Sequence, residues 1–151
     1  ADTVIGRQGG AVLVTLVERK SRFSLIIRAE NKTATAVSAA MTTAMSPHAA
    51  HVHTLTYDNG KEFAYHLKVS DELEAKGFFA HPYHSWERGL NENTNGLIRQ
   101  YLPKGKSFDD LTDQDVVDIM DRLNNRPRKC LGFRTPNEVF REDKSDVALA
   151  S

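Results

Sequence analysis

Two strongly apolar runs, Ala11 to Glu18 and Arg22 to Ala29, follow each other with only three residues between them. The first reads AVLVTLVE, the second reads RFSLIIRA, and the charged turn RKS joins them. Short runs rich in Val, Leu and Ile are typical of strands in a core. Another β-prone stretch, ADTVIG, precedes them. The first thirty residues therefore predict a meander of three strands.

Helical and extended patterns alternate along the rest of the chain. An Ala-rich helix is predicted within Asn31 to His48, and Pro47 closes it. A strand over Val52 to Tyr57 comes next, then a helix to about Leu73, and then the stretch GFFAHPY, which we expect to be a short buried strand. Later helices are predicted at NENTNG, over Thr112 to Asn125, and at TPNEVF. This order predicts an α/β fold with a mixed five-stranded sheet and helices on both faces.

Composition narrows the classes of protein. The chain has 151 residues, of which 40% are hydrophobic and 26% charged, enough for one domain with a core. It contains no apolar run of membrane-spanning length and no secretion signal, and Cys130 is its one cysteine, so we expect a reducing, cytoplasmic compartment and no membrane partner. Histidines 51, 53, 81 and 84 lack the spacing of a zinc site.

Charge is unevenly distributed although the formal net charge is zero. The segment Arg122 to Arg134 holds five basic residues and no acid, whereas Asp109 to Asp121 holds six acids and no base. Such a basic segment is either a solvated helix end, favoured by the helix dipole, or a contact for nucleic acid.

Three acidic residues fall where predicted elements meet. Asp2 lies on the first strand, Asp58 follows the strand that ends at Tyr57, and Glu92 lies near the start of a later helix. Loops that leave a sheet commonly form a site. Each acid alone is well explained by a surface or capping role, but the three together predict a metal site.

Several stretches resemble the catalytic core of DDE transposases of bacterial insertion sequences, specifically the insertion-sequence-thirty family. They are DTVIG, LVTLVERKSRF, TLTYDNGKEF, HPYHSWERGLNENTNGLIRQYLPKG and LNNRPRKCLGFRTPNEVF. Because the resemblance covers nearly the whole chain, residues 1–151 are expected to be one integrase-like catalytic core domain. It implies a ribonuclease H-like fold, as in the related retroviral integrases, and metal-dependent cleavage and transfer of DNA strands.

Carried over residue by residue, the resemblance assigns the catalytic and metal-binding triad to Asp2, Asp58 and Glu92. The 33 residues between Asp58 and Glu92 match the spacing that characterises this class. Two Mg²⁺ or Mn²⁺ ions are expected, because hard cations prefer carboxylate oxygens and supply the positive charge that phosphodiester chemistry needs. The expected enzyme is a transposase, a polynucleotidyl transferase. A metal-dependent nuclease that does not join strands and an inactive DNA-binding relative are the alternatives.

Amide and basic side chains around the triad are expected to contact DNA. Asn91 and Asn95 are expected to orient the Glu92 carboxylate or to reach phosphate, and Arg99, seven residues after Glu92, shares the helix face of Glu92 and is expected to point toward DNA. The alternative for Arg99 is an ion pair on its own surface. Basic residues that follow the last long helix suit the DNA backbone. The predicted DNA-binding residues are Asn59, Lys61, Asn91, Asn95, Arg99, Arg126, Arg128 and Lys129.

The resemblance also implies partners and a larger protein. Element ends and target DNA are the expected partners, with a homo-oligomer assembled on DNA in the bacterial cytoplasm, associated with the nucleoid. The family's proteins carry an N-terminal helix-turn-helix region that has no counterpart in this chain, so we expect sequence-specific recognition of element ends to be missing. Only Ala1 precedes Asp2, and we therefore expect Asp2 to fray and to bind metal poorly. Tyr83 and Trp86 are expected either in the core or stacked on a base.

Overall fold

The computed structural model describes residues 1–57, 60–79 and 89–142. Its first three strands form the predicted antiparallel meander: β1 (Asp2–Ile5) pairs with β2 (Val12–Val17), which pairs with β3 (Ser24–Ala29). In this register Asp2 lies opposite Thr15, and Thr15 lies opposite Ile26. The apolar character of β2 therefore reflects its place in the middle of the sheet.

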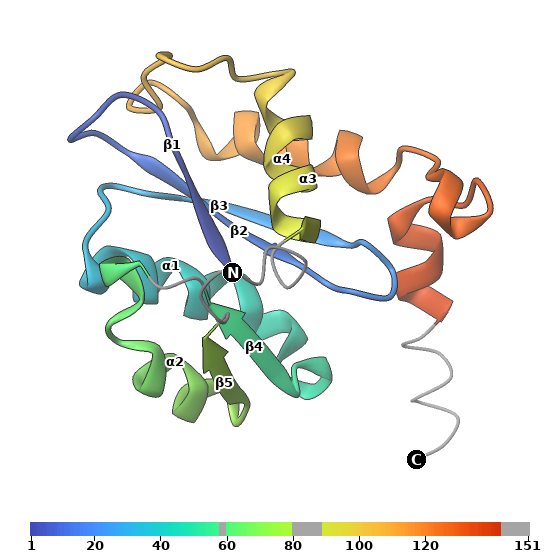
Figure 1. Ribbon diagram of the computed structural model, residues 1–151, viewed down its shortest axis with the longest axis horizontal. Helices are drawn as coiled ribbons and strands as arrows, with labels where there is room; N and C mark the ends of the chain where they lie inside the picture. The colour runs from blue at the N-terminus through green and yellow to red at the C-terminus, as the bar shows by residue number, and fades with distance from the viewer. Residues whose placement is uncertain (58–59, 80–88, 143–151) are drawn as a thin grey trace.

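The remaining two strands described are parallel. β4 (Thr54–Tyr57) pairs with β5 (Lys76–Phe79), and Tyr57 lies opposite Phe79. The nitrogen of Ala1 donates a hydrogen bond to the carbonyl oxygen of Thr56, so the end of β4 runs beside the start of β1 (Figure 1). The predicted α/β class with five strands is confirmed, with the strands arranged as an antiparallel sheet of three and a parallel pair.

Helices cover both faces of the meander. They are α1 (Ala34–Met45), α2 (His66–Leu73), α3 (Gly89–Arg99) and α4 (Asp113–Asn124), with short 3₁₀ turns at Ser46–His51, Lys61–Phe63 and Lys129–Leu131 and a further helical segment at residues 136–142. Figure 1 shows α1 and α2 on one side of the sheet and α3 and α4 on the other. None of the described helices is long and apolar enough to cross a membrane.

Side-chain hydroxyls fix where the helices start. Thr33 accepts a hydrogen bond from the backbone of Ala36 and so begins α1. Thr112 and Asp115 form a reciprocal capping box that begins α4. Thr135 accepts from the backbone of Glu138 at the last described helical segment. These caps satisfy N–H groups that have no partner within the helix.

The core divides into two clusters because β2 alternates its side chains between faces. Val12 and Val14 pack with α1, α2 and β4, whereas Leu13 packs with α3 and α4. Tyr57 and Phe108 are among the largest fully buried side chains, one in each cluster. Burial on both sides anchors β2, and with it the register that places Asp2 opposite Thr15.

One expectation about the strands is wrong. The predicted strand GFFAHPY overlaps β5 (Lys76–Phe79), whose four residues are all exposed instead of buried; the rest of the predicted stretch, residues 80–83, lies outside the described residues. Phe78 is 53% exposed and Phe79 is 38% exposed. In the described part of the chain β5 pairs with β4 alone, and an edge strand lacks the cover that a central strand receives. Apolar composition by itself therefore did not reveal its place in the fold.

Candidate active site

Asp2 is a buried carboxylate at the start of β1, with a relative exposure of 6%. The backbone N–H of Thr3 donates to its Oδ1 at 2.8 Å, and Nδ2 of Asn95 donates to its Oδ2 at 3.2 Å. Pairing with Thr15 across the sheet holds the backbone. The expectation that Asp2 frays is therefore wrong, because long-range contacts tie down this end of the chain.

Asn95 connects the helix α3 to both β1 and β2. Besides donating to Asp2, its Oδ1 accepts a hydrogen bond of 3.0 Å from the hydroxyl of Thr15, which is fully buried. Both ends of the amide are thus engaged with protein groups. Asn95 was expected to orient Glu92 or to reach DNA. In the structure its side chain donates to a different one of the three predicted acids, Asp2.

Glu92 lies in the first turn of α3, and its side chain is exposed. It precedes Asn95 by three residues, so both side chains share one face of the helix. Because Asn95 contacts Asp2, this helix face is turned toward the start of β1. The fold thus carries two of the three predicted acids to one region, although they are ninety residues apart in the sequence.

Asp58 and Asn59 lie outside the described residues, as do His81, Tyr83, His84 and Trp86. The flanking Tyr57 is the last residue of β4, whose neighbour Thr56 accepts the hydrogen bond from Ala1. The chain therefore enters the segment that contains Asp58 beside the strand that carries Asp2. Within the described ranges no group of three His, Cys, Asp or Glu residues is placed to hold a metal.

Glu62 is a buried acid in this region that the sequence analysis did not single out. It is 4% exposed, accepts a hydrogen bond of 2.9 Å from the hydroxyl of Thr3, and lies 3.4 Å from Nζ of Lys32. Its carboxylate folds over Gly60 so closely that a Cβ there would collide with it. Its turn, Lys61–Phe63, is too short to show periodicity, so the one available signal was the glycine two residues earlier.

Lys61 and Asn91 are predicted DNA contacts that lie close to Asp58 and Glu92 in the sequence. Lys61 begins the 3₁₀ turn and is exposed, and Asn91 is half-buried in the first turn of α3. Arg99 is the last residue of α3 and contacts protein groups. Its Nη2 donates to the carbonyl oxygen of Ile5 at 2.6 Å, and its guanidinium lies over the ring of Phe108. A contact between Arg99 and DNA stays a prediction.

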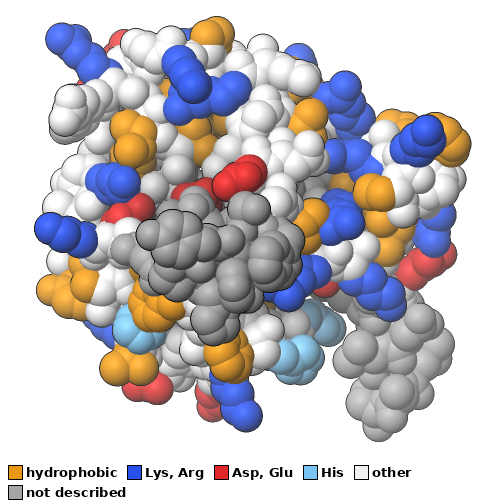
Figure 2. Space-filling model, viewed as in Figure 1, with side chains coloured by type: hydrophobic (Ala, Val, Ile, Leu, Met, Phe, Trp, Pro, Cys, Tyr) orange, Lys and Arg blue, Asp and Glu red, His pale blue; other side chains and the backbone are white. Residues whose placement is uncertain are grey.

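The basic residues after α4 divide into inward and outward side chains. Arg128 is half-buried and donates through Nη2 to the carbonyl oxygen of Leu123 at 3.2 Å, which fastens the following loop to the end of α4. Burial lowers the pKa of Arg128, and the nearby charge of Arg126 lowers it further. Arg126 and Lys129 are exposed. Figure 2 shows Lys and Arg side chains gathered over this part of the surface, at the right of the view.

The donor set suits a hard cation. Asp2 and Glu92 carry carboxylate oxygens on a strand and on a helix, whereas Asp58, the third predicted ligand, lies outside the described residues. Mg²⁺ and Mn²⁺ prefer such oxygen ligands and retain several waters.

Sequence comparison relates the chain to transposases. No protein-family model matches it. It is 46% identical over 152 residues to the transposase of insertion sequence element IS4351 from Bacteroides fragilis, and this alignment covers 99% of this chain and 47% of the relative. It is 40% identical over 140 residues to the transposase of IS30A from Escherichia coli K12, covering 92% of this chain and 36% of the relative. The chain thus spans less than half the length of these relatives.

Solved structures with the same fold are integrase cores. The catalytic core domain of BIV integrase matches with a TM-score of 0.68 at 17% identity, covering 97% of this chain and 95% of that one. The HTLV-2 integrase catalytic core domain in complex with magnesium matches with a TM-score of 0.67 at 19% identity, covering 91% and 90%. The fold, with a buried aspartate heading its first strand, is that of an integrase-type, ribonuclease H-like catalytic core.

The sequence relatives indicate a family. Over the segment they share, the chain is similar to insertion-sequence transposases of the IS30 family, among them those of IS30A, IS4351 and IS1086. Both parts of the expected resemblance, to these transposases and to retroviral integrase cores, are confirmed.

Proposed function

We propose that this chain is the catalytic core of a DNA transposase that cleaves and joins DNA strands through Asp2, Asp58 and Glu92. One observation carries the proposal: the Asp2 carboxylate is buried at the head of β1 and is held by Asn95, one helical turn after Glu92. In a relative of insertion-sequence transposases, that arrangement supports a site in which carboxylates from separate elements converge.

The three acids would hold two Mg²⁺ or Mn²⁺ ions, which when bound supply Lewis acidity toward a phosphodiester and its attacking oxygen. The chain's own part is to position the ligands. The N–H of Thr3 and the amide of Asn95 fix the rotation of the Asp2 carboxylate, and Thr15 fixes the amide in turn. Such supporting hydrogen bonds hold ligand groups in a productive geometry before substrate binds.

DNA contacts are proposed in two groups. Exposed or half-buried side chains near the acids and after α4 are proposed to contact DNA directly; they are Lys61, Asn91, Arg126 and Lys129, with Asn59 outside the described residues. Asn95, Arg99 and Arg128 have protein partners, so we propose that any contact they make with DNA uses their remaining donors. Backbone contacts of this kind contribute affinity that falls as salt rises.

The proposed partners are the ends of a mobile element and a target DNA, with a homo-oligomer assembled on them. One structural relative is an intasome, and the HTLV-2 integrase core is described as trimeric; for this chain, assembly is a proposal. The proposed location is the bacterial cytoplasm, at the nucleoid. The reaction that we propose therefore requires two metal ions, the element ends and a target DNA.

The decisive experiment compares the chain with its Glu92→Gln variant, which keeps the size of the side chain and removes its charge. Labelled DNA carrying element ends is incubated with Mg²⁺ or Mn²⁺, with the family's end-binding region joined to the chain, and nicked and joined products are separated. We expect joining by the parent and none by Glu92→Gln. Glu72→Gln, an exposed acid on α2, is the matched control and should retain activity.

The results separate the candidates. Equal activity of Glu92→Gln and the parent would remove Glu92 from the site. Cutting without joining would favour a metal-dependent nuclease, and metal-independent binding without either reaction would favour an inactive DNA-binding relative.

A further inference from the structure

A hydrogen-bonded loop with basic residues at both ends follows α4. We call residues Arg128 to Arg134 the basic loop. The backbone N–H of Arg128 donates to the carbonyl oxygen of Arg134 at 3.0 Å, and the N–H of Phe133 donates to the carbonyl oxygen of Arg128 at 2.8 Å. Together with the inward hydrogen bond from Arg128 to Leu123, these contacts make the loop a defined structure with a fixed base.

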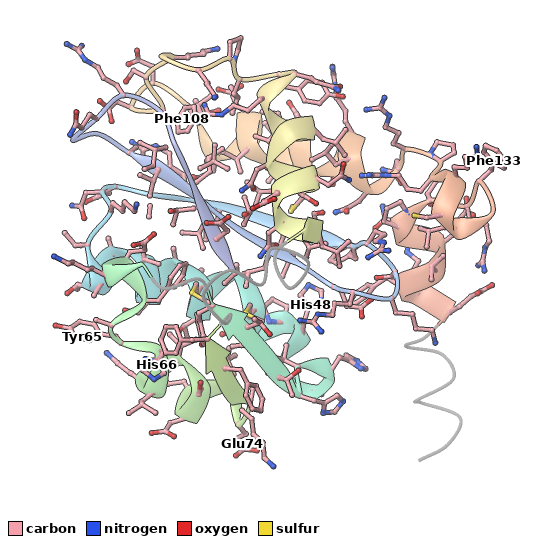
Figure 3. The ribbon with its side chains drawn as sticks, viewed as in Figure 1. His48, Tyr65, His66, Glu74, Phe108 and Phe133 are labelled. Atoms are coloured by element: carbon pink, nitrogen blue, oxygen red, sulfur yellow. The ribbon has the colours of Figure 1, made fainter. Side chains whose placement is uncertain are left out.

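Phe133 immediately precedes Arg134, the closing residue of the basic loop, and two features make its position unfavourable by itself. The side chain is 71% exposed, which is the highest value among the large exposed hydrophobic residues of the described ranges. Its backbone is left-handed, with φ of 65°, directly after Gly132 with φ of 63°. A bulky side chain is disfavoured in that region. Figure 3 shows Phe133 at the outer edge of the molecule, away from the core.

Strain and exposure at one residue commonly mark a functional constraint. The loop geometry holds an aromatic ring outward, and nothing in burial accounts for it. An occupant that covers the ring would recover the free energy that its exposure withholds. The chemistry of the neighbouring side chains indicates which kind of occupant would bind there.

Several side chains of this loop and of the residues just before it are cationic. Lys129 and Arg126 are exposed, and Arg134 is 41% exposed although it pairs with Glu142 at 2.6 Å. Burial lowers the pKa of Arg128, and the positive charges of Arg126 and Arg22 lower it further. In Figure 2 hydrophobic and basic side chains lie side by side on the lobe at the right of the view. A flat aromatic surface bordered by cations complements a base joined to phosphates.

We infer that the basic loop is a DNA contact in which the Phe133 ring stacks on an exposed base while Lys129 and Arg126 neutralise the adjacent phosphates. This inference rests on the proposed function, because it requires that the chain acts on DNA. It adds a base-stacking residue that the acid triad does not include, and it assigns Arg128 to holding the loop. Unpaired or distorted DNA is the expected ligand, since a base inside a regular duplex has no exposed face.

The test measures binding, without any reaction. Fluorescence anisotropy with a short labelled single-stranded oligonucleotide at low salt, without divalent metal, compares the 151-residue chain with Phe133→Ala, Phe133→Leu and Phe133→Trp. Loss of one base–aromatic stack weakens binding roughly 5- to 150-fold. We expect Phe133→Ala to show such a loss, Phe133→Leu to remain weak, and Phe133→Trp to bind at least as tightly as the parent. The loss should be smaller on a duplex of the same sequence.

Two matched variants sharpen the result. Tyr65→Ala removes another exposed aromatic side chain, 49% exposed at the opposite edge of the view in Figure 3, and should leave affinity unchanged. Lys129→Ala should lower the salt dependence of log K by about 0.7 for a single strand. Phe133→Gly should raise the urea midpoint, because glycine accepts a left-handed backbone, and still weaken DNA binding.

The outcomes are distinct from those that test the acid triad. Salt-dependent binding by the parent that is unchanged in Phe133→Ala overturns the inference and leaves the proposed function standing. A dimer that Phe133→Ala converts to monomer, with DNA affinity unchanged, overturns it in favour of a second copy of the chain. Failure of the parent to bind any DNA overturns both proposals, whereas a Glu92→Gln variant that binds normally but lacks activity supports the triad independently.

Discussion

Replacing Asn95 with alanine tests whether the contacts around Asp2 hold the candidate site together. The change removes the bond of 3.2 Å to the Asp2 carboxylate and the bond of 3.0 Å from the Thr15 hydroxyl. A neutral buried hydrogen bond contributes about 1 kcal/mol and one to a charged group about 1.5–3 kcal/mol. Alanine returns up to about 0.7 kcal/mol through its higher helix propensity. We therefore expect a net destabilisation of about 2 kcal/mol.

The assay is urea unfolding at neutral pH without divalent metal, with the free energy of unfolding extrapolated to water. Asn93→Ala is the control: it makes the same replacement on the same helix at an exposed position. That variant should be as stable as the parent or slightly more stable, because it gains helix propensity and loses no buried contact.

A double-mutant cycle with Thr15→Val isolates one bond of the pair. In Asn95→Ala the Thr15 hydroxyl keeps its longer contact of 3.4 Å to the carbonyl oxygen of Asp2. The coupling energy between Asn95→Ala and Thr15→Val should therefore report the single hydrogen bond between the two side chains, about 1 kcal/mol. A stability of Asn95→Ala equal to that of Asn93→Ala, or a coupling energy near zero, would refute the reasoning that this amide joins α3 to the sheet.

Three further predictions concern Asn95 again, the buried acid Glu62 with its partner Lys32, and Asp109. Asn95→Asp places a second carboxylate against Asp2 and should lower the melting temperature without metal, with added Mg²⁺ restoring more of it than in the parent. Glu62→Ala should destabilise by about 2 kcal/mol in urea unfolding, because it removes the buried acceptor of the Thr3 hydroxyl, while Lys32→Met should cost under about 1 kcal/mol since Lys32 is 43% exposed; equal effects would contradict this assignment. The hydrogen bond from the Ala11 N–H to Asp109 holds the pKa of Asp109 below its usual range. A depressed folded pKa contributes stability above the unfolded value, about 4, that is lost as pH falls through the folded value. The unfolding midpoint of Asp109→Asn should accordingly change less than that of the parent between neutral and acidic pH.

The sequence by itself determined the elements. The closely spaced runs of AVLVTLVE and RFSLIIRA specify a meander because no helix fits between them, and the continuous apolar pattern of β2 reflects burial on both faces. Thr112 and Thr135 cap the helices that follow them through local hydrogen bonds, which need no distant partner. The resemblance to the transposases of insertion sequences predicted the fold, because its motifs extend along nearly the whole chain.

Only the tertiary structure decided which side chains meet. Asn95 contacts Asp2 and Thr15 across sequence separations of 93 and 80 residues, and nothing local to any of them specifies that contact. It follows from the packing of α3 on β2. The same holds for Glu62 beneath Thr3, for Arg128 turned toward the end of α4, and for the exposed strand β5. Residue type and spacing fix local hydrogen bonds and periodic faces, whereas the partner of a polar side chain is set by how those faces pack.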